Sequence, residues 1–183
     1  GLYIPISAPN RQLHWTRGDF FFFGTARRQF VAVCQNSKDN ERLGKIKRAN
    51  ARPQMATKTS FVSHEQPSIA DDIKITNAFY DAPTVITMFA PKDFLFSKED
   101  CALAAENIML AADVFGIGSC YIGQGWEAFA DPYGQEILKQ WNIPNDRYAV
   151  MQLLLGYPRE GDKHPTPKPR KEGRIIRIGE DNK

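Results

Sequence analysis

The sequence predicts a single domain that combines helices and strands, in an α+β or α/β arrangement. Residues 81–158 carry the clearest pattern, because a strand, a long helix, a glycine-rich turn, a second strand, a second helix and a third strand follow one another there. The 183 residues, 42% of them hydrophobic, suffice for one substantial core and are too few for two ordinary domains. We therefore treat residues 1–183 as one folding unit.

The first half of the chain contains few regular elements. A run of four phenylalanines, 20–23, indicates a buried strand or packed loop, with an aromatic ligand wall as the alternative. The stretch "FVAV" at 30–33 is typical of a strand. Residues 37–50 predict a short amphipathic helix with Ser37 as its N-cap, acidic residues in the first turn and basic residues in the last. Between 51 and 78 we expect loops and short helices.

The second half begins with "DAPTVITMFAP" at 81–91, whose β-branched residues between prolines predict a buried strand. Residues 97–115 predict a long helix with Ser97 as its N-cap. This helix is apolar on nearly all sides, so we expect it to be buried on nearly all sides, in a core or at a subunit interface. Gly116 is expected to end it with a positive φ.

Three further elements follow in the sequence. "SCYIG" at 119–123 is strand-like, residues 126–144 predict a second amphipathic helix, and 147–158 predict a buried strand. The tail from 162 onward is basic and interrupted by prolines. Prolines keep such a tail extended, so its cations suit a phosphate, although a solvated tail is the alternative. These cations are Lys163, Lys168, Arg170 and Lys171.

Composition and motifs exclude several classes of protein. The net charge of +3 does not by itself indicate nucleic-acid binding. The three cysteines have no CxxC spacing and predict reduced thiols in a cytoplasmic protein. We find neither a run near the roughly 18 apolar residues of a membrane span nor a signal peptide, and the missing initiator Met suggests a trimmed or partial chain. GxSxG, Walker A, HExxH and paired-cysteine motifs are also missing.

The stretch "FGIGSCYIGQG" at 115–125 places four glycines in eleven residues. It follows a helix and lacks GxGxxG spacing, which argues against a dinucleotide fingerprint. Two interpretations remain at this point. The glycines form a tight structural turn, or a flat or anionic ligand lies against the main chain.

Taken in order, "DAPTVITMFA", "SKEDCALAAENIMLAADVFGIGSCYIG", "LKQWNIPNDRYAVMQLLLGYP" and "KPRK" resemble the flavin-dependent nitroreductase family over residues 81–178. The resemblance implies an α+β, three-layer fold, with a central and mostly antiparallel sheet flanked by helices. It also implies an intertwined homodimer whose active sites lie at the subunit interface. The family's N-terminal RRSxRxF motif is missing, so this part of the fold is expected to be absent or altered.

The same resemblance implies an FMN site, in which small residues let the flat flavin ring pack on the main chain. Backbone N–H groups would lie near N5 and O4 of the ring. The segment "SAPNRQLHW" would supply further ring contacts, and the basic tail would hold the FMN phosphate. The implied cofactor-binding residues are Asn10, Gln12, Ile117, Gly118, Tyr121, Ile122, Gly123, Lys168 and Arg170. No residue is assigned a catalytic or metal-binding role, because the flavin would carry the chemistry.

The implied function is the transfer of two electrons from NADH or NADPH to a nitroaromatic, quinone or related acceptor. Donor and acceptor would use one pocket in turn, which implies ping-pong kinetics. The expected partners are the acceptor and a second subunit, without nucleic acid or membrane. One alternative is an FMN-binding or storage protein, or a degenerate family member with little turnover. Another is a dimeric α+β protein whose basic tail binds an acidic partner.

Overall fold

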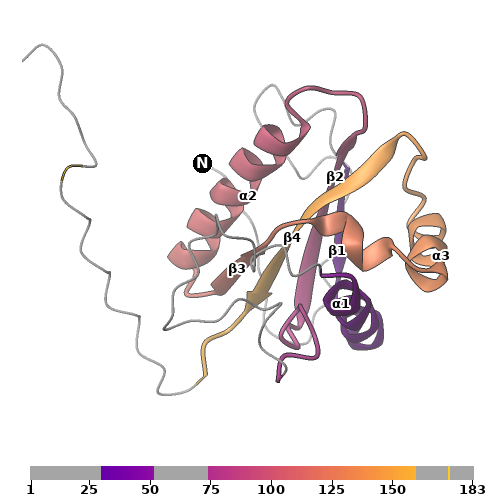
Figure 1. Cartoon of the computed structure of the whole chain (residues 1–183). Coiled ribbons are helices and arrows are strands. Elements are labelled where there is room, and N and C mark those ends of the chain that lie inside the picture. The colour runs from indigo at the N-terminus through magenta and orange to yellow at the C-terminus, as the bar shows by residue number, and fades with distance from the viewer. Residues whose placement is uncertain (1–29, 52–73, 160–172, 174–183) are drawn as a thin grey trace, which may run out of the picture.

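The computed structural model describes residues 30–51, 74–159 and 173 of the chain, and its arrangement of helices and strands is shown in Figure 1. The described elements confirm an α+β fold. In chain order they are β1 (Phe30–Cys34), α1 (Ser37–Asn50), β2 (Thr84–Pro91), α2 (Ser97–Val114), β3 (Gly118–Ile122), the 3₁₀ helix η3 (Gly125–Phe129), α3 (Pro132–Gln140) and β4 (Arg147–Gly156).

The four described strands form one antiparallel sheet in the order β1-β2-β4-β3. The two central strands, β2 and β4, are almost entirely buried, as expected from their apolar sequences. The register between them shifts at Met88 and Phe89, which pair with Met151 and Ala149. Val150 is therefore the extra residue of a β-bulge. This order leaves β3 at one edge of the described sheet.

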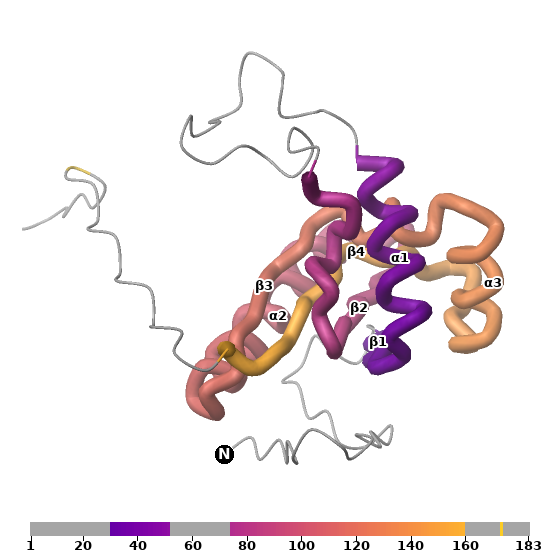
Figure 2. The backbone as a smooth tube through the Cα atoms, turned by 90° about the horizontal axis from the view of Figure 1, so that it is seen from below, coloured from indigo at the N-terminus to yellow at the C-terminus, as the bar shows by residue number. Residues whose placement is uncertain are grey.

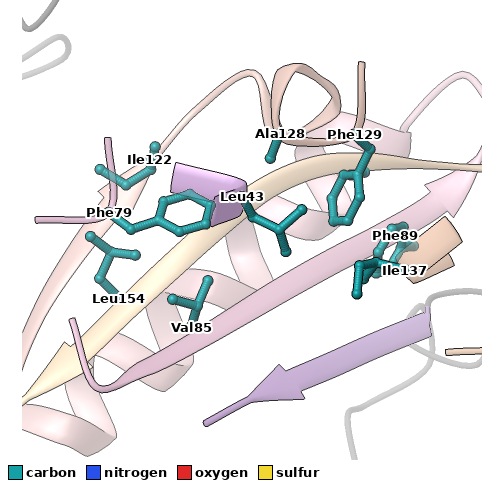
Figure 3. Close-up of a cluster of buried hydrophobic side chains, with 10 residues drawn as sticks. Leu43, Phe79, Val85, Phe89, Ile122, Ala128, Phe129, Ile137 and Leu154 are labelled. Atoms are coloured by element: carbon teal, nitrogen blue, oxygen red, sulfur yellow. The ribbon is translucent and has the colours of Figure 1, made fainter. Parts of the chain in front are cut away.

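Helices cover both faces of this sheet and give three layers, as the family resemblance implies. On one face α2 packs against Met88 and Leu153. On the other face α1, η3 and α3 pack against Val85, Phe89 and neighbouring side chains, a cluster drawn in Figure 3. Figure 2, seen from below, shows α1 in the foreground and α2 behind the sheet.

The helix N-caps differ from the expected ones. Asn36, not Ser37, caps α1, and its side-chain oxygen accepts hydrogen bonds from the N–H groups of Lys38 and Asp39. Ser97 is the first residue of α2 rather than its cap, and its hydroxyl donates instead to the Pro91 carbonyl at 2.7 Å. In both cases the serine lies one position too far into the helix to bond the N–H groups that a cap must satisfy.

The single helix expected over 126–144 is divided into η3 and α3. Asp131 caps α3 by accepting from the Gly134 N–H at 2.8 Å, and Pro132 occupies the first turn. Proline has no N–H to continue a preceding helix, and it disfavours helical backbone in the residue before it. The corner is tight, because a Cβ on Gly134 would lie 2.5 Å from the Phe129 Cα.

Within the described single chain, α2 is buried on one side, and its expected burial at a subunit interface stays a prediction. Its residues facing the sheet are buried, Cys101, Ala105 and Ile108 among them. On the opposite side Leu103 is 66% exposed and Val114 is 81% exposed. Among the described residues, α2 packs against the sheet, and its outer apolar side chains have no such cover.

The cysteines carry free thiols, in agreement with the expected reduced state. Cys34 and Cys101 are buried, and Cys120 is exposed on β3. None of the helices in the described ranges combines the length and apolar character needed to cross a membrane.

Candidate functional site

The glycine-rich stretch begins with a structural turn. Gly116 has a φ of +67°, which glycine adopts without steric cost, and confirms the expected end of α2. Its N–H donates to the Asp113 carbonyl, and the Ile117 N–H donates to the Ala112 carbonyl, both at 2.9 Å. This pair of bonds is a Schellman motif, which satisfies the last carbonyls of the helix. Ile117 is buried beside the motif.

The next five residues are strand β3 rather than a loop. Tyr121 pairs with Leu153 and therefore lies on the α2 face of the sheet, whereas Ile122 pairs with Gln152 and is buried on the α1 face. The Tyr121 side chain is 44% exposed. Because the two side chains lie on opposite faces, a flat ligand could contact both residues only along the backbone edge of β3.

The chain turns away from the sheet at Gly123–Gly125, which we call the glycine bend. Gly123 is exposed, and among the described residues a Cβ there would have the Tyr121 ring as its neighbour within 4 Å, at 3.7 Å. Gln124 has a φ of +55°. Gly125 is buried, and a Cβ there would lie 2.6 Å from the Met151 backbone nitrogen. The bend is therefore open at its first residue and pressed against β4 at its last.

A buried lysine lies against the inner side of the glycine bend. Lys47, near the end of α1, is 4% exposed, and its Nζ donates hydrogen bonds to three oxygens. These are the carbonyl of Gly123 at 2.7 Å, the carbonyl of Gln124 at 2.6 Å and Oε2 of Glu127 at 3.2 Å. Glu127, on η3, is also buried. The bend and the helix after it are thus attached to α1 by one side chain.

The charge state of this lysine follows from its partners. Burial lowers the pKa of Lys47 from its ordinary value of 10.5, while the Glu127 carboxylate acts in the opposite direction. A neutral amine has two N–H donors, whereas three oxygen acceptors require the three donors of an ammonium group. Lys47 and Glu127 therefore form a buried ion pair.

The third carbonyl of the bend is held from the sheet. Gln152 on β4 is fully buried, and its Nε2 donates to the Gly125 carbonyl at 2.9 Å. All three carbonyls of the glycine bend consequently accept hydrogen bonds from buried side chains on two different elements.

Lys47 is not among the site residues predicted from the sequence. In the sequence it is one of the basic residues that favour the end of a helix, although the helical pattern contains a further indication. The buried positions of α1 are Asn40, Leu43, Gly44 and Lys47, which follow the three- and four-residue spacing of one helix face. A lysine on the apolar face of an amphipathic helix indicates a buried charge that needs partners.

The predicted cofactor-binding residues fall into two groups. Among the described ones, Gly118, Tyr121 and Gly123 are exposed along β3 and the bend, whereas Ile117 and Ile122 are buried. The others lie outside the described residues, namely Asn10, Gln12, Lys168 and Arg170. Within the described ranges, no three His, Cys, Asp or Glu side chains come together as a metal-binding group.

In a comparison with protein families, the profile of the nitroreductase family matches residues 22–157. The match includes all four described strands and the glycine bend. No curated protein sequence matches the chain.

Solved structures with the same fold include two bacterial nitroreductases with bound FMN. The protein from Bacteroides fragilis superposes with a TM-score of 0.63 at 22% identity, covering 84% of this chain and 78% of its own. The protein from Desulfitobacterium hafniense gives 0.63 at 20% identity, covering 83% and 76%. An iodotyrosine deiodinase bound to FMN and 3-iodo-L-tyrosine gives 0.53 at 20% identity, covering 85% and 78%. At these identities the similarity shows a shared fold.

Proposed function

Because the chain belongs to the nitroreductase family, we propose that it is an FMN-dependent oxidoreductase that passes electrons from NADH or NADPH to a nitroaromatic, quinone or related acceptor. The observation that carries the proposal is the family match across the whole sheet, together with an exposed strand edge and glycine bend inside the matched region. The FMN-bound proteins of the same fold support the choice of cofactor.

The described residues fit a flat ring at the glycine bend. Gly123 leaves open space beside the exposed Tyr121 ring, and the bend's three carbonyls are turned toward Lys47 and Gln152. The N–H and C=O groups of a trans peptide point in opposite directions. All peptides of the described residues are trans, because none of them is cis. At Gly123 the outer side of the bend can therefore offer main chain without a side chain. We assign the ring of FMN to this side, along Gly118 and the stretch 121–123.

FMN, when bound, would supply the two-electron chemistry, so the protein needs no acid or base of its own for the hydride step. The work of the polypeptide would be to hold the ring and to aim backbone N–H groups at its N5 and O4. It would also shape one pocket for nicotinamide and acceptor in turn. Use of one pocket by both substrates gives ping-pong kinetics, and initial rates at several acceptor concentrations should yield parallel double-reciprocal lines. Intersecting lines would contradict this part of the proposal.

The phosphate and further ring contacts belong to residues outside the described ranges. We propose Lys168 and Arg170 for the phosphate, and Asn10 and Gln12 for the ring. Arg170→Ala should weaken FMN binding by the roughly 1.5–3 kcal/mol of a hydrogen bond to a charged group. Fluorescence titration of the apoprotein with FMN measures this loss, and titration with riboflavin, which has no phosphate, provides the control. Equal losses for both ligands would remove Arg170 from the phosphate site.

We also propose that the exposed side of α2 forms a homodimer interface. Leu103, Leu110 and Val114 are spaced by seven and four residues and therefore form one stripe along the helix, away from the sheet. Such a stripe on a helix with its other face already packed is a surface that a second subunit could bury.

The visible absorption spectrum of the purified protein tests the proposed cofactor, followed by release and identification of the chromophore. Oxidised-flavin bands and released FMN are expected. Anaerobic addition of NADH or NADPH should then bleach these bands promptly. Tight FMN binding without reduction would instead support a storage protein or a degenerate member. Failure to bind FMN at all would overturn the proposal.

A further inference from the structure

We propose that Lys47 is a positioning residue, which together with Gln152 holds the glycine bend in the shape that receives the flavin ring. The inference rests on the proposed function, because the ring is assigned to the outer side of this bend. It assigns a role to a lysine of α1 that lies 76 residues from Gly123 in sequence and does not itself face the ring side.

The first argument is that Lys47 uses its whole bonding capacity on this segment. Each of its three ammonium donors has one oxygen partner, and all three partners belong to residues 123–127. A lysine that served only to pair with Glu127 would not need two peptide carbonyls at 2.6 and 2.7 Å. The hydrogen bonds to Gly123 and Gln124 are the shorter ones, whereas Glu127 supplies the opposite charge.

The second argument is energetic. A buried ion pair is weak evidence for stability, because desolvation of the two charges offsets much of their attraction. Apolar residues of similar volume often serve a core equally well. A methionine at position 47 would fill similar space, yet it could not hold the carbonyls of Gly123 and Gln124. The property that only the lysine supplies is therefore the orientation of two peptide groups.

The third argument is geometric. Gln124 has a φ of +55°, a conformation that residues other than glycine rarely adopt and that surrounding contacts must maintain. The Lys47 ammonium bonds the carbonyls on both sides of the Gln124 Cα, and Gln152 fixes the next carbonyl in the chain. With the carbonyls fixed inward, planar trans peptides turn the N–H edges of the bend toward the opposite side. The ring then meets a surface whose shape is already set.

The test uses three variants of the full chain. Lys47→Met with Glu127→Gln removes the carbonyl bonds and leaves no buried unpaired charge. Glu127→Gln alone removes the ion pair but keeps the lysine. Lys45→Met is the matched control, because Lys45 lies on the same helix, two residues away, with 56% of its side chain exposed. Each apoprotein is titrated with FMN, and backbone ¹⁵N order parameters are measured for residues 122–126.

We expect the bend of the double variant to adopt the FMN-binding conformation about one tenth of the time. The variant should therefore bind FMN about tenfold more weakly than the parent. Its order parameters at the bend should fall from about 0.85 toward 0.6 or lower. Lys45→Met should retain the affinity and the order of the parent. Glu127→Gln keeps the two carbonyl bonds of Lys47 but removes its counterion, so it should lose less FMN affinity and less order at the bend than the double variant. The bound-flavin spectrum of the double variant should also shift toward that of free FMN.

The inference is overturned if the double variant keeps both parental FMN affinity and parental order at the bend. It is also overturned if Glu127→Gln alone causes the full loss, because the ion pair would then be the essential contact. Failure of the proposed function gives a different result, in which even the parent binds no FMN. In that case the order parameters of the apoproteins still decide whether Lys47 holds the bend.

Discussion

The two helical layers on either side of the sheet have opposite chemistry. Beneath α2 the contacts are almost purely apolar, and the buried polar side chains of this helix, Ser97 and Asp100, lie in its first turn. Beneath α1 the core surrounds buried polar groups, with Lys47, Glu127 and Gln152 close together. Among the described residues, the outer side of α2 is exposed at Leu103, Leu110 and Val114, whereas the α1 layer uses its buried polar atoms to hold one bend.

This difference indicates a division of tasks. The outer side of α2 is an exposed apolar stripe of Leu103, Leu110 and Val114, so it suits the proposed second copy of the chain. A buried charge, by contrast, must keep its acceptors or lose several kcal/mol. The α1 layer therefore holds the backbone of the glycine bend in place, and the α2 layer presents an apolar surface for the proposed homodimer.

The largest effect is expected at the buried charge of the α1 layer. Lys47→Met leaves the Glu127 carboxylate buried without its partner, which should cost about 3–5 kcal/mol in the free energy of unfolding. Urea denaturation followed by circular dichroism measures this loss. Lys45→Met, at an exposed position, should stay within about 0.5 kcal/mol of the parent. Similar values for the two lysines would show that the buried ion pair of Lys47 contributes no more to stability than an exposed charge.

The α2 layer should show its own dependence on pH. Burial, followed by the nearby Asp100, raises the pKa of Cys101 from its ordinary 9.0 to about 12. Between these values the unfolded chain has released the thiol proton and the folded chain has not. The contribution of Cys101 to stability is therefore intact below pH 9 and is lost as the pH rises from 9 to about 12.

The difference between the parent and Cys101→Ala isolates this contribution from the other titrating groups. Unfolding free energies at pH 8, 9, 10 and 11 should converge as the parent loses stability faster than the variant. Curves that remain parallel over this range would show that the thiol does not control alkaline stability.

A smaller effect is expected within the glycine bend itself. Gly125→Ala would place a Cβ 2.6 Å from the Met151 nitrogen and 2.8 Å from the Val150 carbonyl carbon. Neither backbone atom can move freely, so we expect a loss of about 1–3 kcal/mol, the usual range for overpacking. Gly123→Ala serves as control, because its Cβ would have room, and its stability should change little. Thermal denaturation of both variants measures their loss of stability. Equal losses of stability in the two variants would contradict the crowded contact at Gly125.

The smallest effect on the folded monomer is expected on the outer side of α2. Leu110 is 58% exposed, so Leu110→Lys should alter the unfolding free energy of the monomer by less than about 0.5 kcal/mol. The same change should disrupt the proposed homodimer, because it places a charge in an apolar interface. Sedimentation velocity of parent and variant measures the association. A dimer that persists in the variant would place the interface elsewhere.

Much of the fold could be predicted from local sequence. The strands at 84–91 and 147–156 and the helix at 97–114 follow from their apolar patterns, and Gly116 marks the end of that helix. Predictions failed where one residue decides a boundary. Asn36 rather than Ser37 caps α1, and Pro132 divides the expected helix after Phe129.

The candidate site was only partly predictable. The sequence predicted cofactor-binding residues in the glycine-rich stretch, and three of them, Gly118, Tyr121 and Gly123, are exposed there. Sequence could not separate Gly123 from Gly125, because both are glycines in the same short segment. The two glycines differ in the space for a side chain, because the backbone of β4 packs against Gly125 and not against Gly123.

By itself, the sequence determined the order of helices and strands and membership of the nitroreductase family, because both depend on patterns along the chain. Only the tertiary structure decided which side of α2 is exposed and which groups Lys47 bonds. A buried ammonium is stable only where oxygen acceptors surround it. Its acceptors lie 76 to 80 residues away and meet it only when α1 and the bend pack on the same face of the sheet.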